Sequence, residues 1–219
     1  MDVKKELKRG EFYYINPLDV VVQPELRGRH FAPSEESVID LAKSMLDQGQ
    51  LQAVEVRKTK IDGKDKLQLI LGFTRTAAAC LIRNGFTDSD GTKYQDADFM
   101  LQVLIVTAND EVSFIHNIVE NAKRNATSPI DDAHNQDRLR QRYGKTDAEI
   151  ARLYGYNSQN KVARLHKLLA LERHEQQLVH DDKLSVTAAL ELLEMPPEQR
   201  KEIIEAAMRE NGSVNGQEV

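Results

Sequence analysis

Apolar and polar positions follow a two-residue period in the first half of the chain, which predicts strands, and a helical period between those strands. Ser34 is placed to cap a helix that Gly49 ends, and Asp62-Gly63 is a typical hairpin turn. Residues 1–16 are expected to be a loosely held lead-in. The predicted strands are 18–22, 53–58, 66–71 and 99–106, and the predicted helices are 34–49, 75–84 and 110–124.

Every segment after Ser128-Pro129 has the helical period instead. The predicted helices are 129–143, 147–154, 160–170, 173–180, 185–193 and 197–210. The sequence therefore predicts an α+β protein. A small α/β domain over 1–126 precedes an all-α domain over 127–212, and a polar tail over 213–219 is expected to be disordered.

Composition is that of a folded, soluble chain: 219 residues, of which 40% are hydrophobic and 30% charged. No apolar run approaches the ~20 residues that span a bilayer, and no secretory leader is evident, so we expect a cytoplasmic protein without membrane partners. Cys80 stands alone, which excludes a disulfide framework and favours a packed apolar residue over a catalytic thiol. The six histidines show no metal-ligand spacing.

Charge is unevenly distributed along the chain, whose formal net charge is −5. Residues 138–175 contain nine Lys and Arg against four Asp and Glu, a balance of +5, which leaves −10 for the remainder. Phosphate contact is local, so a basic segment within an acidic chain is compatible with nucleic-acid binding.

That basic segment has the pattern of a helix-turn-helix. Thr146 and Glu149 form a capping box, Gly155 permits a sharp turn, and apolar residues from Val162 to Leu169 bury one side of a second helix. Amide side chains suit adenine, arginine suits guanine and lysine suits phosphate. The alternative is an ordinary helical hairpin with a solvated polar face. The candidate DNA-binding residues are Ser158, Gln159, Asn160, Lys161, Arg164 and Lys167.

Four segments in the right order resemble the ParB family of partition proteins, over about residues 18–193. The first combines Gln23-Pro24, Arg27 or Arg29, and a helix ending in 48–52. The second is 71–79 (LGFTRTAAA), and the third is 119–131 (VENAKRNATSPID). The last comprises the helix-turn-helix followed by 182–189 (DKLSVTAA).

The resemblance implies a CTP-binding fold shared with sulfiredoxin, whose nucleotide state controls closure of a homodimeric clamp on double-stranded DNA, with at most slow CTP hydrolysis. Glu120 and Asn121 are then the expected Mg²⁺ ligands, although with Arg124 they are alternatively a structural link. The nucleotide-binding candidates are Gly49, Gln50, Gly72, Phe73, Thr74, Arg75, Glu120, Asn121 and Arg124.

This sequence departs from the family pattern at three pocket positions. Phe73 replaces a glutamate, Thr74 a basic residue and Ala53 a proline. The chain also resembles a short form without the usual C-terminal dimerisation domain, and a stripe in 197–210 predicts a helix that packs into the core rather than a dimer coil.

We therefore expect a sequence-specific DNA-binding protein of plasmid, chromosome or phage partition, or a transcriptional regulator. It would be associated with nucleoid or plasmid and have a partition ATPase as a further partner. Two other classes remain open. A phosphotransfer enzyme or nuclease on the same fold would use Glu55 or Glu120. A nucleotide-free adaptor would be explained by Phe73 and Ala53.

Overall fold

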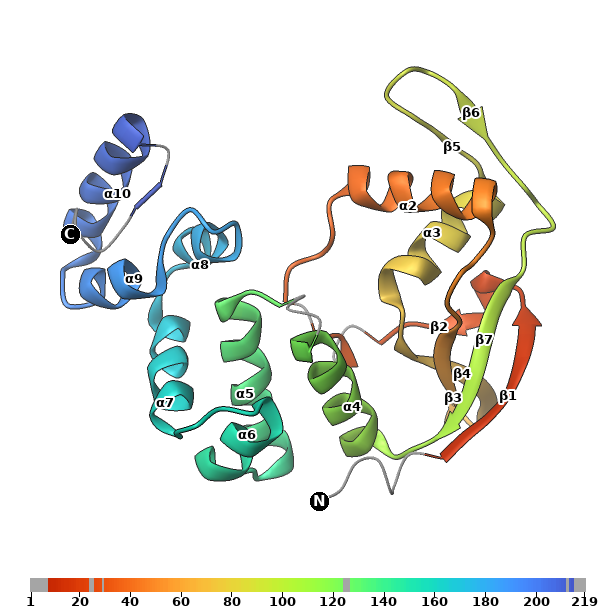
Figure 1. Ribbon diagram of the computed structural model, residues 1–219, viewed down its shortest axis with the longest axis horizontal. Helices are drawn as coiled ribbons and strands as arrows, with labels where there is room; N and C mark the ends of the chain where they lie inside the picture. The colour runs from red at the N-terminus through yellow and green to blue at the C-terminus, as the bar shows by residue number, and fades with distance from the viewer. Residues whose placement is uncertain (1–7, 24–25, 29, 124–126, 212, 215–219) are drawn as a thin grey trace. The chain divides into compact units, whose positions relative to one another are not determined.

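The computed structural model describes residues 8–23, 26–28, 30–123, 127–211 and 213–214, and within it the chain forms two compact units (Figure 1). The first comprises Met1–Arg27 and Ala32–Asn117, and the second Gly28–Phe31 and Ile118–Val219. The sequence-based division at 126/127 differs from this one. In the structure the boundary lies between Asn117 and Ile118, within the continuous helix α4 (Asp110–Lys123). The predicted α+β class is confirmed.

A five-stranded mixed sheet forms the first unit, in the order β1-β7-β3-β4-β2. β1 pairs antiparallel with β7, β7 parallel with β3, β3 antiparallel with β4, and β4 parallel with β2. The strands are β1 (Lys8–Ile15), β2 (Val20–Val21), β3 (Val54–Ile61), β4 (Lys64–Leu71) and β7 (Leu101–Thr107).

The predicted hairpin turn joins β3 to β4. Asp62 and Gly63 have φ values of 50° and 74°, the left-handed pair that matches strand twist in a two-residue loop. Ile61 pairs with Lys64 directly beside the turn. This register places Val56 opposite Leu69, so that both side chains lie on one buried face of the sheet.

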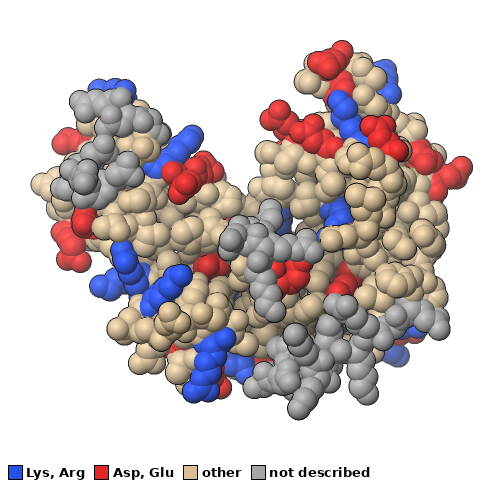
Figure 2. Space-filling model, viewed as in Figure 1, with Lys and Arg blue, Asp and Glu red and all other residues tan. Residues whose placement is uncertain are grey.

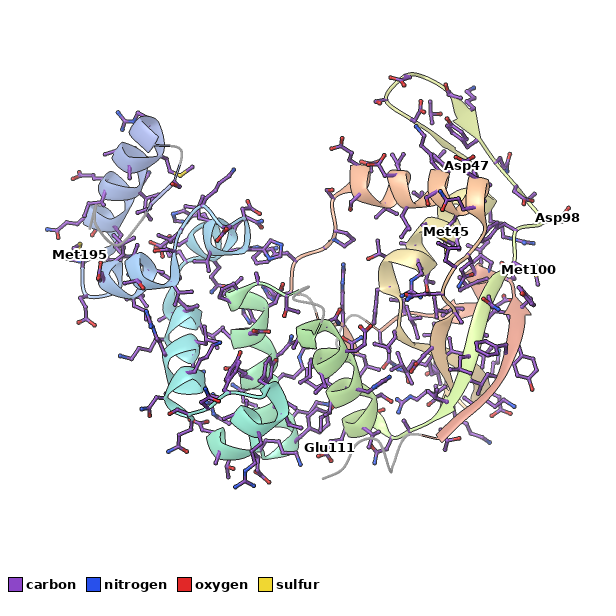
Figure 3. The ribbon with its side chains drawn as sticks, in the orientation of Figure 1. Met45, Asp47, Asp98, Met100, Glu111 and Met195 are labelled. Carbon is purple, nitrogen blue, oxygen red and sulfur yellow. The ribbon has the colours of Figure 1, made fainter. Side chains whose placement is uncertain are left out.

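Two helices cover that face of the sheet: α2 (Glu35–Gln48) and α3 (Phe73–Asn84). Ser34 caps α2 as predicted, its side chain accepting a hydrogen bond from the Ser37 N–H. Met45 is buried beneath α2, whereas Asp47 lies on its exposed side, as Figure 3 shows. The core includes Val38, Ala42, Met45, Val54, Val56, Leu69, Ala78, Ala79, Ile82, Leu101 and Val103.

The opposite face of the sheet carries a buried polar network. Arg57 donates from Nε to Oε1 of Gln68 over 2.6 Å and from Nη1 to the carbonyl of Ala108 over 3.1 Å, and it forms an ion pair with Asp110. Asn117 on α4 donates to the backbone carbonyl of Ile70 over 2.6 Å. These bonds anchor α4 to the sheet by directional contacts as well as by apolar packing.

Three predictions for the first unit were wrong or incomplete. Residues 8–15 form β1 rather than a loose lead-in, because β7 offers them a full antiparallel partner. The predicted strand at 18–22 is a 3₁₀ turn, η1 (Pro17–Asp19), followed by the two residues of β2. A small hairpin of β5 (Phe86–Thr87) and β6 (Lys93–Tyr94) was not predicted.

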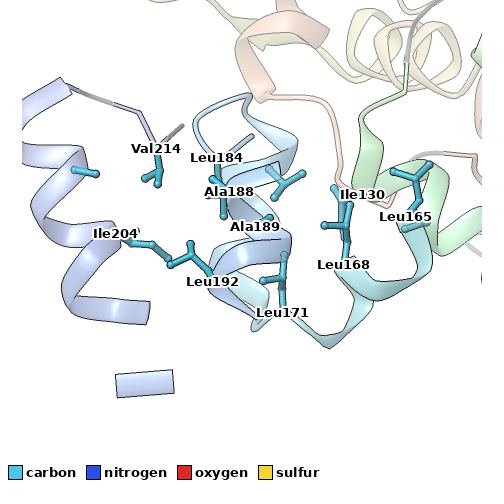
Figure 4. Packing of buried hydrophobic residues seen from close by; sticks show 13 residues of the cluster. Ile130, Leu165, Leu168, Leu171, Leu184, Ala188, Ala189, Leu192, Ile204 and Val214 are labelled. Carbon is cyan, nitrogen blue, oxygen red and sulfur yellow. The ribbon is translucent and has the colours of Figure 1, made fainter. Parts of the chain in front are cut away.

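The described part of the second unit is helical apart from one β-bridge, Leu184 with Val214, and its helix boundaries are close to those that the periodicity predicts. Its core is built mainly of leucine and alanine side chains from five of its helices (Figure 4). Thr127 precedes its first long helix. The elements are α5 (Pro129–Tyr143), α6 (Asp147–Tyr154), α7 (Asn160–His166), η3 (Lys167–Ala170), α8 (Arg173–His180), α9 (Val186–Leu192) and α10 (Pro197–Asn211).

The C-terminal helix packs into this core, as predicted. Ile204 and Ala207 of α10 are buried, and Arg200 donates from Nε to Oε1 of the buried Glu175 on α8 over 2.9 Å. The predicted disordered tail needs correction at Val214, which is fully buried because its N–H and carbonyl bond to the segment before α9. Residues 215–219 lie outside the described residues.

The carboxylate of Asp131, which is 1% exposed, is a buried polar group with several partners in the second unit. It accepts hydrogen bonds from the backbone N–H of Ser128 over 3.1 Å and of His30 over 2.6 Å. Nδ1 of His180 lies 3.5 Å from it. One side chain thus caps α5 and holds Gly28–Phe31 in the helical unit.

Asp131→Ala should lower the free energy of unfolding of the helical unit by about 2–4 kcal/mol, because it removes a cap and leaves buried N–H donors without an acceptor. Urea denaturation followed by circular dichroism, with hydrogen exchange of α5, measures the change. Asp137→Ala on the same helix removes only partly exposed contacts, with Arg140, His166 and Gln141, and should cost less than about 1 kcal/mol. Equal losses in both variants would contradict the role of Asp131.

Candidate nucleic-acid interface and nucleotide site

The helix-turn-helix is formed by α6, a turn at Gly155 and α7. Thr146 and Glu149 make both bonds of the predicted capping box at the start of α6. Gly155 has a φ of 69°, the left-handed conformation that ends α6, and Tyr156 then donates its N–H to the Ala151 carbonyl over 2.8 Å. The small side chain of Ala151 is buried.

Packing of α7 decides which of its side chains face solvent. Val162 and Leu165 are buried, and Leu168 continues the buried side into η3. Lys and Arg side chains gather over α6 and α7 in Figure 2. All six predicted DNA-binding residues are exposed: Ser158, Gln159, Asn160, Lys161, Arg164 and Lys167.

Three of these residues are held by neighbours. The Ser158 hydroxyl accepts a hydrogen bond from the Asn160 N–H over 3.1 Å, just before the start of α7. The Lys161 ammonium lies 4.1 Å from the centroid of the Tyr156 ring, a cation–π contact. Arg164 donates from Nη2 to Oγ1 of Thr187 over 2.9 Å. The contact with Thr187 was not predicted, because this residue lies 23 positions further along the chain on another helix.

A groove of about 690 Å³ opens beside this surface, between α7 and the first turns of α5 and α9. Its walls combine apolar side chains with polar groups of the recognition helix. The lining residues are Thr127, Pro129, Asp132, Asn160, Lys161, Arg164, Leu165, Val186 and Thr187.

Asp132 is the acidic group of that groove. Thr127 donates to its Oδ1 over 2.9 Å and Tyr156 to its Oδ2 over 3.2 Å. Burial raises the pKa of Asp132 to about 6, and these hydrogen bonds hold it from rising further. Below about pH 6 the Asp132 carboxyl is protonated and neutral, so the negative charge beside Lys161 is then absent.

Two glycines predicted to approach a nucleotide adopt left-handed conformations. Gly72 has a φ of 96° and begins α3, and an added Cβ would lie 2.6 Å from Cγ1 of Val54. Close packing of helix on strand therefore explains Gly72 without a ligand. Gly49 has a φ of 74° at the end of α2, with open space around it.

The neighbouring polar candidates are engaged in the fold. Arg75 donates from Nη1 to the carbonyls of Gln52 and Ala53, over 2.9 and 2.8 Å. Gln50 bridges to β7, exchanging two hydrogen bonds of 2.8 Å with the backbone of Gln102. Phe73 packs against the apolar core. Thr74 is partly exposed in the first turn of α3.

Glu120 and Asn121 lie near the end of α4 and belong to the second unit, whereas the glycines and Arg75 belong to the first. Their oxygen ligands suit Mg²⁺, but adjacent positions of a helix face different directions, so the pair alone is not a chelating set. Arg124 lies outside the described residues. Glu55, the other carboxylate considered for catalysis, is buried with Oε2 2.8 Å from Nε2 of His116.

Comparison with known proteins finds similarity along most of the sequence. The ParB HTH domain model matches residues 125–219. The probable chromosome-partitioning protein ParB of Neisseria meningitidis is 28% identical over 180 residues, which is 82% of this chain. Residues 125–219 are thus similar to the ParB HTH domain, and most of the chain is similar to a ParB protein. The chain spans 57% of the length of that relative.

Solved ParB structures have the same fold. A C-terminally truncated ParB from Caulobacter crescentus, complexed to the centromeric parS site, has a TM-score of 0.55 at 20% identity and covers 94% of this chain and 95% of its own. A Pnob8-like ParB-N domain has a TM-score of 0.57 at 14% identity, covering 91% and 90%. The α/β unit and the helical unit are thus the ParB arrangement of elements.

The described part of the chain contains no helix long and apolar enough to cross a bilayer. It also contains no cluster of three or more His, Cys, Asp or Glu side chains that would hold a metal ion by themselves. Cys80 is partly buried in α3, where burial raises the pKa of its thiol, so packing accounts for it as expected.

The raised pKa of Asp132 predicts a pH-dependent stability. The folded state retains the proton to about pH 6 and the unfolded chain loses it near pH 3.8, so the free energy of unfolding should fall as pH rises between these values. We expect the difference in free energy of unfolding between the wild type and Asp132→Asn to change by about 1–3 kcal/mol from pH 4 to 7. Denaturation at a series of pH values measures it.

A second variant tests the cause of that slope. Thr127→Val removes a hydrogen bond that lowers the pKa of Asp132. The pH at which stability changes should therefore be higher in this variant than in the wild type. Parallel pH profiles of the wild type and Asp132→Asn would contradict the assignment.

Proposed function

We propose that this chain binds double-stranded DNA in a sequence-specific manner through α7, as a partition or regulatory protein of the ParB family. One observation carries the proposal: in a complete helix-turn-helix, all six candidate side chains are exposed on the second helix and the residues that flank it, while the other side of that helix is buried. A helix of that kind fits the major groove, with base contacts from its first turns.

Each exposed side chain has a role in such a complex. Gln159 and Asn160 offer paired donor and acceptor groups for adenine, and Arg164 offers two parallel N–H groups for guanine. Lys161 and Lys167 suit phosphates, which fix register and supply salt-dependent affinity. The basic residues of 138–175 supply that field locally, although the whole chain is acidic.

Arg164→Ala should weaken binding to a selected duplex site by about 1–3 kcal/mol and leave binding to random duplex nearly unchanged. Lys167→Ala should weaken both and reduce the slope of log affinity against log salt by about 0.9. Fluorescence anisotropy with labelled duplexes at several salt concentrations measures both effects.

Two exposed basic residues outside the interface serve as controls: Arg209→Ala on α10 and Lys64→Ala on the β3–β4 hairpin. Both should bind like the wild type. Undiminished specific binding by Arg164→Ala would remove that residue from base recognition, and absence of any duplex binding by the wild type would refute the proposed function.

The wider role follows from the relatives and remains part of the proposal. The relative in Neisseria meningitidis is named a probable chromosome-partitioning protein, and the one from Caulobacter crescentus was solved with centromeric parS. We infer a homodimer that reads a two-fold site, a cytoplasmic location on nucleoid or plasmid DNA, and a partition ATPase as partner.

We further propose that CTP, held with Mg²⁺, gates DNA binding through the first unit. The first turn of α3 is the best-supported phosphate position, because Gly72 leads into an N-terminus whose backbone N–H groups favour anions and Thr74 is partly exposed there. Glu120 and Asn121 would supply oxygen ligands to the cation. Arg75 is a poor single test of this pocket, since it also holds the carbonyls of Gln52 and Ala53.

Thr74→Asp separates folding from nucleotide binding. A carboxylate in the first turn of a helix is stabilising by about 0.3–1 kcal/mol, yet it repels a phosphate at that turn. Calorimetric titration with CTP, ATP or GTP plus Mg²⁺ should show binding by the wild type and Thr74→Ser, and at least a tenfold weaker affinity for Thr74→Asp. Equal affinity in all three would move the site away from α3, and no binding by the wild type would exclude nucleotide gating.

A further inference from the structure

A hydrogen bond joins the proposed recognition helix to a helix that follows it at some distance in sequence. Nη2 of Arg164, on the outward side of α7, donates to Oγ1 of Thr187 in the first turn of α9 over 2.9 Å. Both residues are exposed and both line the groove beside α7. We propose that Thr187 is a positioning residue, which orients the Arg164 guanidinium to read a guanine in the major groove; this rests on the proposed DNA-binding function.

Thr187 has no evident task in building its own helix. Ser185 caps α9, its side-chain oxygen accepting a hydrogen bond from the Ala188 N–H over 3.2 Å. The buried side of the helix consists of Ala188, Ala189 and Leu192. An exposed β-branched residue in the first turn adds nothing to that packing, and within the described part of the chain the hydroxyl of Thr187 bonds to Arg164.

Both helices that carry this hydrogen bond are fixed by packing in the core. α7 is fixed by Val162 and Leu165, and α9 by fully buried side chains of the same core. The groove that Arg164 and Thr187 share is also lined by Pro129, Leu165 and Val186, which offer apolar surface to the stem of the arginine. A long side chain is thereby restrained both along its stem and at its head.

The contact leaves Arg164 able to read a base at the same time. A guanidinium carries five N–H donors in a planar fork, of which Thr187 engages one and O6 and N7 of guanine engage two. Fixing the plane before binding reduces the rotamer freedom that is lost on contact. Because only the pairing with guanine uses that plane fully, the effect belongs to sequence preference at one position and not to general affinity for DNA.

Selection from a duplex library with a randomised centre, followed by sequencing of the bound fraction, tests the proposal without a known site. The wild type should enrich a defined motif. Arg164→Ala should enrich the same motif without the base preference at one position of each half-site. Thr187→Val, which keeps the shape and removes the hydroxyl, should weaken the preference at that same position about two- to tenfold. Thr187→Ser should restore it, and Glu191→Ala, an exposed residue of α9, should leave the motif unchanged.

Each other result has a defined meaning. A Thr187→Val motif identical to the wild type, a uniform loss at every position, or failure of Thr187→Ser to restore the preference overturns the positioning role. So does an Arg164→Ala motif that equals the wild type. A wild-type protein that enriches no motif refutes sequence-specific binding itself, which is a separate failure of the proposed function.

Discussion

The helical unit depends on one buried carboxylate, that of Asp131. A buried carboxylate is tolerated only where donors surround it, and here they come from the start of α5 and from the backbone of His30, with Nδ1 of His180 on α8 3.5 Å away. His30 also stacks on His134, with ring centroids 3.7 Å apart, so Gly28–Phe31 is held from two sides. Because α5 supports α7, the anchor lies beneath the proposed DNA-binding surface.

Specific recognition in this fold requires that the exposed side of α7 has a fixed orientation, and the core supplies it. Val162 and Leu165 fix the rotation of the helix about its axis, which determines that Arg164 and Lys161 face outward. Tyr156 then restrains Lys161, and Thr187 restrains Arg164. The side chains proposed to contact DNA are thus oriented by residues of neighbouring elements.

Local signals were sufficient for most of the fold. The caps at Ser34 and Thr146, the turn at Asp62-Gly63 and the glycine at 155 each act within a few residues, and each was predicted correctly. β1 was missed because its structure depends on pairing with β7, about 90 residues away, rather than on its own pattern. Thr187 was missed for the same reason, since its partner lies on another helix.

Sequence motifs were less informative about the nucleotide site, because the same residue fits both a phosphate-binding role and a purely structural role. Gly72 fits a phosphate-binding turn, yet its contact with Val54 requires a glycine in any case. Arg75 fits a phosphate partner, yet it bonds to two backbone carbonyls at the start of β3. The exposed amide and basic side chains of α7 are not required by its packing, so DNA binding is the part of the proposal that the fold supports most directly.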